Sequence, residues 1–413
     1  MGQPTINFYG AHWCPDCRRA KQFLGEHQIP YRWVDIEQDP AGEQYVIQKN
    51  NGKRIIPTLE FSDGSILVEP TNAELAAKLG LKTTAARRHY DLIIVGGGPA
   101  GLTAALYAAR EGIDALVVER AAPGGQAATT ERLDNVPGFA EGIEGAVFAE
   151  QLHRQVDRFG AELLQAQEVV KVHSHDNYRC IDTADGSQYS ACALLLATGS
   201  RYRRLGAPGE ESYIGAGIHF CSTCDAPFYK GMPVVVVGGG NSAAEESLFL
   251  VKFAERVTLL VRGEDLKASQ VIREKVQRHP QIDIRFQTEV VRFDGAGGKL
   301  KSVTIKNRLN GTTEVLNPAG VFVFVGQTPN TAFLAGSGIR INRWGYIITG
   351  HNLLHDGDRP PVYEKREPSI LETSVPGIFA AGDVRAGSTK QVASATGEGA
   401  TAALLVREYL KTT

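Results

Sequence analysis

The stretch Asp91-Leu-Ile-Ile-Val-Gly-Gly-Gly-Pro-Ala-Gly101 decides the fold of most of this chain. A short apolar strand runs directly into glycines spaced as G-x-G-x-x-G, and a helix-forming segment follows. Gly96 permits the tight turn, Gly98 lets the backbone approach a pyrophosphate, and Gly101 lets the helix pack close to the strand. The helix N-terminus adds a partial positive charge that faces the phosphates. The next strand, residues 115–118, ends at Glu119, where a carboxylate can bind ribose hydroxyls.

A second copy of this pattern lies further along the chain, in Val234-Val-Val-Val-Gly-Gly-Gly-Asn-Ser-Ala243. Gly238, Gly240 and Ala243 repeat the spacing, with Asn241 and Ser242 opening the helix. The strand that follows, residues 257–261, ends in Arg262 instead of an acid, and Lys267 is a second nearby cation. An arginine at this place can pair with a 2′-phosphate, which favours NADP over NAD. The alternative is a solvated arginine at a strand end.

Composition limits the class of protein. The 413 residues are 43% hydrophobic and 22% charged with a net charge of −2, as in ordinary globular proteins of two to four domains. We expect no nucleic-acid partner, because no basic surface is indicated, and no membrane span, because the apolar runs are short. The N-terminus has no secretory pattern, so a cytoplasmic location is expected. Three strand–turn–helix units, at residues 6–24, 91–110 and 233–253, predict an α/β fold.

Four of the six cysteines form two C-x-x-C pairs, Cys14/Cys17 and Cys221/Cys224, while Cys180 and Cys192 stand alone. In a reducing compartment such pairs are redox centres or metal ligands. Zinc needs four ligands, and only His219 lies near the second pair, so we predict no metal. The two single cysteines are expected to be buried structural thiols.

Residues 90–413 resemble the small bacterial-type thioredoxin reductases in the two glycine turns, in Cys221-Ser-Thr-Cys224-Asp225, and in several shorter motifs. The resemblance implies FAD at the first turn, NADPH at the second, a homodimer, and an NADPH domain that rotates to alternate its cysteines between flavin and partner. It makes Cys224 the flavin-side sulfur, Cys221 the interchange thiol and Asp225 the proton donor and acceptor. Gly263 departs from the family, which usually has a second arginine there. The implied FAD contacts are Gly96, Gly98, Pro99, Ala100, Gly101, Glu119, Gly125, Gln126, Asn135, Ala197, Thr198, Gly199, Gly382, Asp383, Gln391 and Val392; the implied NADPH contacts are Gly238, Gly240, Asn241, Ser242, Arg262 and Lys267.

Residues 6–79 resemble glutaredoxins, most closely the mycoredoxin-like branch, in Trp13-Cys14-Pro15-Asp16-Cys17, Ile56-Pro57-Thr58 and other motifs. Cys14 precedes a helix, whose dipole stabilises a thiolate, and Arg18, Arg19 and Lys21 add positive charge. The resemblance implies that Cys17 is the resolving thiol and that the Ile56–Pro57 bond is cis. The sequence Leu67-Val-Glu-Pro-Thr71 replaces the Gly-Gly turn with which glutaredoxins bind glutathione.

These features predict a thioredoxin-fold domain at residues 1–80, a linker at 81–89, an FAD domain at 90–204 and 326–413, and an NADPH domain at 205–325. Fully extended, a linker of this length reaches roughly 30 Å. Electrons would pass from NADPH through FAD to Cys221/Cys224, then to Cys14/Cys17 and on to protein disulfides of thioredoxin, glutaredoxin or peroxiredoxin type. In the alternative, the N-terminal domain is only a docking or sensing module of a thioredoxin or peroxiredoxin reductase.

Overall fold

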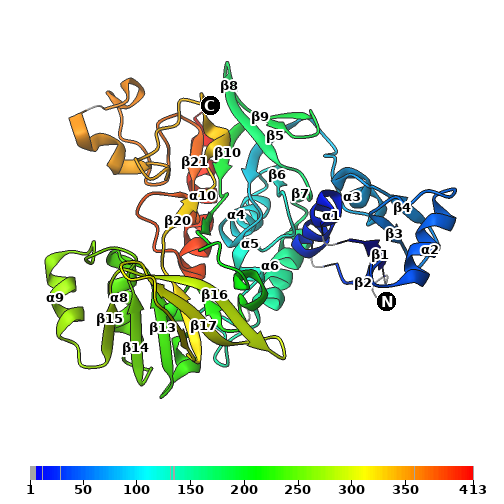
Figure 1. Cartoon of the computed structure of the whole chain (residues 1–413). Coiled ribbons are helices and arrows are strands. Elements are labelled where there is room, and N and C mark those ends of the chain that lie inside the picture. Colours follow the sequence, from blue (N-terminus) through cyan, green and yellow to red (C-terminus); the bar gives the residue numbers. More distant parts are fainter. Residues whose placement is uncertain are drawn as a thin grey trace.

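The computed structural model describes residues 6–11, 13–27, 29–130, 132–133, 135–357 and 359–412, apart from the side chains of Glu26, Thr223, Cys224 and residues 355–357. Figure 1 shows an N-terminal module in blue at the right, a central domain, and a second dinucleotide domain in green and yellow at the lower left. The central domain also takes in the red C-terminal helix, so the chain leaves it and returns.

A four-stranded sheet forms the N-terminal module. The strand order β2-β1-β3-β4 has β1 parallel to β2 and antiparallel to β3. Ile6 and Phe8 alternate with less buried residues along β1 and enter an apolar core that also contains Cys14 and Cys17. This arrangement confirms the predicted thioredoxin-like fold, and the predicted cis bond at Ile56–Pro57 is present. The elements are β1 (Ile6–Gly10), α1 (Pro15–Glu26), β2 (Tyr31–Asp35), α2 (Pro40–Lys49), β3 (Thr58–Glu60), β4 (Ile66–Val68) and α3 (Asn72–Lys78).

The segment 81–89 is packed against the central domain, and its last residue, His89, begins strand β5 (His89–Val95). Lys82 and the backbone N–H of Ala86 both bind the carboxylate of Glu162, at 2.6 and 2.8 Å. Arg87 pairs with Asp114 at 2.7 Å, and Ala85 packs on a central core cluster. Only one or two residues therefore separate the N-terminal module from the point where the chain is attached.

The central domain is a largely parallel sheet covered on both faces. The order β7-β6-β5-β10-β9-β8 is completed by β21, which pairs with β10. Strand β5 is a continuous apolar run because Leu92 and Ile94 enter one core cluster and Ile93 and Val95 enter the other. Its strands are β5 (His89–Val95), β6 (Ala115–Val118), β7 (Glu162–Leu164), β8 (Val169–His175), β9 (Tyr178–Thr183), β10 (Gln188–Leu196) and β21 (Ile378–Ala380), and its helices are α4 (Pro99–Arg110), α5 (Gly125–Ala128), α6 (Gly145–Phe159) and α10 (Val392–Leu410).

The second dinucleotide domain has a five-stranded parallel sheet of order β12-β19-β13-β14-β15 and a three-stranded antiparallel sheet, β16-β17-β18. The antiparallel pair β11 (Ser200–Tyr202) and β20 (Gln327–Pro329) carries both crossings to the central domain. The other elements are β12 (Ile218–His219), α7 (Ser222–Asp225), β13 (Pro233–Val237), α8 (Asn241–Leu250), β14 (Arg256–Leu260), α9 (Gln270–Arg278), β15 (Ile282–Arg285), β16 (Thr288–Ala296), β17 (Lys299–Asn307), β18 (Thr313–Leu316) and β19 (Gly320–Val323).

The polar segment from residue 350 contains two short 3-10 helices, Gly350–Gly357 and Pro361–Tyr363. Arg366 holds the buried carboxylate of Glu372 through two hydrogen bonds of 2.7 and 2.8 Å, and Tyr363 is fully buried. The segment thus has its own small core, although the sequence indicated only a polar excursion.

Candidate active site

The first glycine turn leaves no room for larger side chains. A Cβ on Gly96 would lie 2.5 Å from the carbonyl oxygen of Ala197, and one on Gly101 would lie 1.9 Å from that of Gly96. Gly98 is the N-cap of α4 and offers no side-chain acceptor, while Pro99 begins the helix and Ala100 is buried within it. The amides at the start of α4 are therefore available to an anion.

Glu119 is buried at the end of β6 and is tied to the turn. Its two oxygens accept hydrogen bonds from the backbone N–H groups of Gly97 at 2.6 Å and Ala121 at 2.8 Å. Burial raises the pKa of its carboxyl group, and the backbone bonds oppose this. Glu119, Gly96 and Thr198 line a cavity of about 90 Å³. Its glycine cradle, helix N-terminus and strand-end carboxylate fit the adenosine and phosphates of a dinucleotide such as FAD.

The other residues assigned to the flavin come together from distant parts of the sequence. Asn135 donates to the side-chain oxygen of Gln391 at 2.8 Å, and Gln126 donates to the carbonyl of Ser200. Gln391 caps α10 and Val392 begins it. Gly382 has a positive φ of 74°, with Asp383 next to it. Gly125 begins α5, and Ala197 and Gly199 lie in the loop between β10 and β11; Gly125 and Gly199 have positive φ angles.

Sequence reasoning missed three residues at this site. Asn330 and Thr198 exchange hydrogen bonds with each other's carbonyl oxygens, both at 2.8 Å. Glu398, on α10, accepts from the N–H of Gly382 at 2.7 Å, and Lys390 donates to the carbonyl of Asp383 at 2.7 Å. The contact between Asn330 and Thr198 joins residues 132 positions apart, so spacing along the chain gave no signal for it.

The second glycine turn follows β13. A Cβ on Gly238 would lie 2.5 Å from the carbonyl oxygen of Phe324, and Gly240 caps α8. Asn241 accepts a hydrogen bond from the N–H of Ser269 at 2.7 Å, and Ser242 is exposed beside it. The side chains of Arg262 and Lys267 are exposed near the end of β14. A turn of this kind with cations at the strand end fits a nicotinamide dinucleotide that carries a 2′-phosphate.

The core cysteine pair lies at the start of α7, between β12 and the second glycine turn: Cys221 directly precedes the helix and Cys224 is within it. Cys221 is disulfide-bonded. Asp225 ends the same short helix, and its carboxylate lies 3.3 Å from Nδ1 of His219. Nε2 of His219 lies 2.6 Å from the hydroxyl of Tyr229, and both His219 and Asp225 are mostly buried. The expected proton donor is therefore the first member of an Asp–His–Tyr chain, and the sequence had suggested His219 only as a possible metal ligand.

The N-terminal cysteine pair is at the start of α1. Cys14 is the N-cap residue, and its sulfur accepts a hydrogen bond from the N–H of Cys17 at 3.0 Å. Both are free thiols, and both are buried, Cys14 to 4% and Cys17 to 1% exposure. Burial and the neighbouring Cys14 raise the pKa of Cys17 to about 12. Cys14 thus lies at a helix N-terminus, and burial keeps Cys17 protonated.

Two expectations about charge and burial need correction. Arg19 does not serve the thiols, because it pairs with Asp16 at 3.2 Å and also binds Asn72 and Pro70. Lys21 does place positive charge near the pair, where it acts to lower the pKa of Cys17 against the effect of burial. Its own ammonium lies 3.0 Å from the centre of the Trp33 ring, and burial lowers its pKa. Cys180 and Cys192 are free but only partly buried, because they occupy neighbouring strands near the surface of the central sheet.

Among the described residues, no group of three or more His, Cys, Asp or Glu side chains could hold a metal ion. No helix within the described ranges is both long and apolar enough to cross a membrane.

Two dinucleotide turns with a C-x-x-C pair beside one of them define a nucleotide-dependent disulfide oxidoreductase. The family profile for Pyridine nucleotide-disulphide oxidoreductase matches residues 90–399, and the Glutaredoxin profile matches residues 6–66. A thioredoxin reductase of Treponema pallidum is 39% identical over 323 residues, covering 78% of this chain and 98% of that protein. The chain belongs to the thioredoxin reductase family, which uses FAD and NADPH, and it carries a glutaredoxin domain at its N-terminus.

Solved structures agree with this assignment. The thioredoxin reductase of Streptococcus pyogenes matches with a TM-score of 0.71 at 34% identity, covering 79% of this chain and 100% of that one. The Lactococcus lactis thioredoxin reductase in its FR conformation matches with a TM-score of 0.52 at 32% identity, covering 78% of this chain and 100% of that one. The two reductases thus have similar sequence identity to this chain and cover it to a similar extent, but their structures superpose on it to different degrees.

Proposed function

We propose that this chain is a self-contained disulfide reductase that delivers electrons from Cys221/Cys224 to its own Cys14/Cys17 and then to protein disulfides. Bound FAD would supply the electron pair taken from NADPH. The observation that carries the proposal is the presence of two dithiol centres of different character in one polypeptide. With potentials near ~−270 mV for a thioredoxin-type pair and ~−210 mV for a glutaredoxin-type pair, the transfer is downhill by roughly 2.8 kcal/mol.

The transfer between the centres is a thiol–disulfide exchange. The thiolate of Cys221 attacks a sulfur of the oxidised N-terminal pair, and a mixed disulfide with Cys14 forms as Cys17 leaves with a proton. Cys224 then attacks Cys221, which releases Cys14 as a thiolate and restores the Cys221–Cys224 disulfide. Asp225, held by His219, is suited to supply and accept protons at the core pair.

The attached linker limits how this exchange can occur. Figure 1 draws the N-terminal module and the second dinucleotide domain on different sides of the central domain. The module is held close to the central domain by the contacts of Lys82, Ala86 and Arg87, whereas the chain crosses to and from the second dinucleotide domain at the β11–β20 pair. These contacts favour a module that stays in place and a second domain that turns toward it, in the same chain or across a homodimer.

The test replaces Cys14 by Ser and follows NADPH consumption with a small protein disulfide as acceptor. We expect turnover to fall to the background rate, while Cys180→Ser, which removes a free thiol from a surface strand, leaves it unchanged. Unchanged turnover in Cys14→Ser would favour the alternative, a reductase of separate thioredoxins or peroxiredoxins whose N-terminal domain only docks or senses.

Thiol counting distinguishes the electron relay from the docking or sensing alternative without any added acceptor. Each NADPH supplies two electrons, which convert one disulfide into two thiols. In the relay, oxidised wild-type chain reduced by excess NADPH without oxygen gains two more thiols than Cys14→Ser. Equal gains would mean that electrons never reach the N-terminal pair.

A further inference from the structure

Two cations border the second glycine turn at the end of β14. Arg262 lies just beyond this strand, and no described residue forms an ion pair with it. The loop that follows folds back on the turn, because the N–H of Lys267 donates to the carbonyl of Gly239 at 2.6 Å. Lys267 is thereby fixed beside the turn. Gly263, between them, has no side chain to contribute.

A third cation reaches the same place from a distant part of the chain. Arg308 lies in the turn between β17 and β18, and its Nη1 donates to the carbonyl oxygen of Arg262 at 3.2 Å. Its Nε lies 3.3 Å from the carboxylate of Glu289. No described residue bonds its Nη2, and the side chain is 47% exposed. The guanidinium therefore stands at the strand end with one face open to solvent.

The backbone that carries Arg308 is held on both sides. Its N–H donates to the carbonyl of Gln287 at 2.7 Å, and the N–H of Gln287 donates to the carbonyl of Gly263 at 2.9 Å. The side chain of Asn307 accepts from the N–H of Leu309 at 2.9 Å and closes the turn. Arg308 is therefore positioned before any ligand arrives, which lowers the entropy cost of binding.

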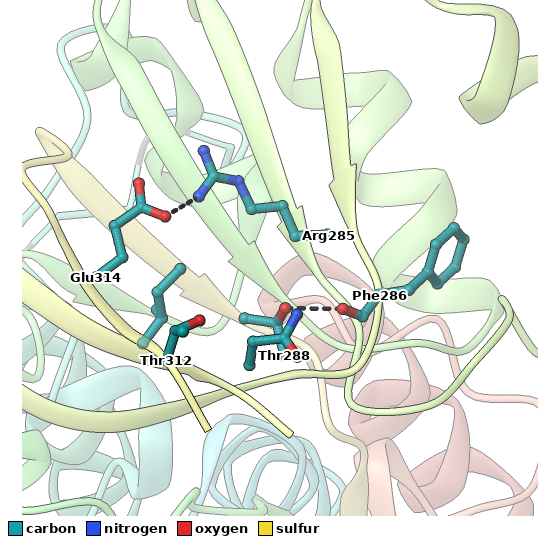
Figure 2. Close-up of a pocket in the computed structure, with 7 residues that line it drawn as sticks. Arg285, Phe286, Thr288, Thr312 and Glu314 are labelled. Atoms are coloured by element: carbon teal, nitrogen blue, oxygen red, sulfur yellow. Dashed lines mark hydrogen bonds and ion pairs between the residues drawn. The ribbon is translucent and has the colours of Figure 1, made fainter. Parts of the chain in front are cut away.

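A cavity beside Arg308 contains a second arginine, Arg285, which is less available to bind an anion. The cavity has a volume of about 300 Å³ and is lined by residues including Arg285, Asn307 and Glu314. Figure 2 shows the side chain of Arg285 reaching Glu314. Arg285 pairs with Glu314 at 2.6 Å and with Asp283 at 3.1 Å, so two carboxylates neutralise its charge. Arg308, next to the lining residue Asn307, has one acidic partner among the described residues, Glu289, and is therefore more available to an anion than Arg285.

We propose that Arg308 is a specificity residue that binds the 2′-phosphate of NADPH together with Arg262 and Lys267. The 2′ substituent of a dinucleotide lies at the end of the second strand of its binding fold, which is the end of β14. A guanidinium binds phosphate through paired hydrogen bonds, which an ammonium does not reproduce. Arg308 would supply the charge that Gly263 cannot. The inference rests on the proposed use of NADPH at this turn.

Two of the three acidic side chains near the end of β14 are paired with arginines. Asp265 pairs with Arg273 at 2.6 Å, and Glu289 pairs with Arg308 itself. Glu264 is exposed and has no ion pair among the described residues. The strand end therefore has three basic side chains, Arg262, Lys267 and Arg308. It has one acidic side chain, Glu264, without an ion pair among the described residues.

The experiment measures the binding of NADP⁺ and NAD⁺ by titration calorimetry on the full-length protein loaded with FAD. The two nucleotides differ only in the 2′-phosphate. For Arg308→Ala we expect NADP⁺ to bind about tenfold more weakly, the usual effect of losing hydrogen bonds to a charged group, with NAD⁺ binding unchanged. Arg308→Lys should lose less, because the charge is kept. Arg292→Ala, which removes an exposed arginine paired with Asp294 in the same sheet, should change neither.

Two results would overturn the assignment of Arg308. One is an equal loss of NADP⁺ and NAD⁺ binding in Arg308→Ala, which would mean that the arginine only braces the turn against β14. The other is unchanged binding of both. A failure of the NADPH assignment itself is distinguishable, because wild-type protein would then bind NADP⁺ no more tightly than NAD⁺.

Discussion

The two cysteine pairs lie in opposite surroundings. Cys14 and Cys17 belong to the apolar core cluster of their module, together with Phe8 and Phe23, and the charge of Lys21 acts on Cys17. Cys221 lies one helical turn from Asp225, which is followed by a chain of polar groups in His219 and Tyr229. One pair relies on a helix N-terminus and burial, and the other has a proton-transfer group beside it.

This difference matches the two chemical tasks that we propose. A pair that is reduced and reoxidised within the enzyme must gain and lose protons at every turnover, so an acid–base residue beside it is useful. A pair that exchanges with other thiols needs a nucleophilic sulfur and a second sulfur that can leave, but no separate acid–base residue beside it. The two centres are therefore not interchangeable, and variants should separate them.

The largest effect is expected from Cys221→Ser. Loss of the interchange thiol should lower turnover by at least about a thousandfold with every acceptor, because the nucleophile acts in all routes. Cys14→Ser should lower turnover only with acceptors that use the N-terminal pair. The turnover of each variant is measured with the small protein disulfide and with a small aromatic disulfide as acceptor. Equal residual rates for the two variants with both acceptors would contradict the division of roles.

Packing around Cys17 gives the next effect. A Cβ on Gly10 would lie 2.8 Å from the sulfur of Cys17 and 2.8 Å from the Trp33 ring, so Gly10→Ala overpacks this core. We expect a loss of about 2 kcal/mol in the free energy of unfolding of the N-terminal module. Gly25→Ala in α1 is the matched control, since its Cβ would meet nothing within 4 Å, and it should not destabilise. Thermal unfolding followed by tryptophan fluorescence measures both, and equal midpoints would contradict the expectation.

Much of the site was predictable from sequence because it is built from local patterns. The glycine turns, the strand-end Glu119 and the C-x-x-C pairs owe their chemistry to spacing within one βα unit, and the sequence contains that spacing. Cys14 at the start of α1 is of the same kind.

The remainder depended on contacts between residues far apart in the chain. Asn330 reaches Thr198 across 132 positions, and Arg308 reaches Arg262 across 46. The sequence also did not predict that residues 81–89 are attached to the central domain. A polar segment with no periodic apolar residues looks like a free linker, and its partner Glu162 is distant in the sequence. The partly buried state of Cys192 was missed because its apolar neighbours in β10 suggested a deeper position.

A smaller effect is expected at the core pair from His219→Phe, which keeps an aromatic ring on Phe322 but removes both nitrogens. We expect NADPH-dependent turnover to fall about tenfold, as for the loss of one hydrogen bond to a charged group. His175→Phe, at a side chain that is 78% exposed, is the control and should keep the wild-type rate. Unchanged turnover in His219→Phe would mean that the Asp225–His219–Tyr229 chain contributes nothing to reduction of the core pair.

The smallest effect concerns the pH dependence of the N-terminal module. Burial raises the pKa of Cys17 from 9.0 to about 12, so the folded module keeps this proton at pH values where the unfolded chain has lost it. The unfolded state then binds fewer protons, and stability falls as pH rises from about 9 toward 12. By pH 10 the loss should be about 1 kcal/mol relative to pH 8. Urea unfolding of wild type and Cys17→Ala at both pH values measures it, and the variant should lack this part of the decline. A decline of the same size in Cys17→Ala would mean that other groups cause it and that the buried thiol contributes nothing to the contrast between the two centres.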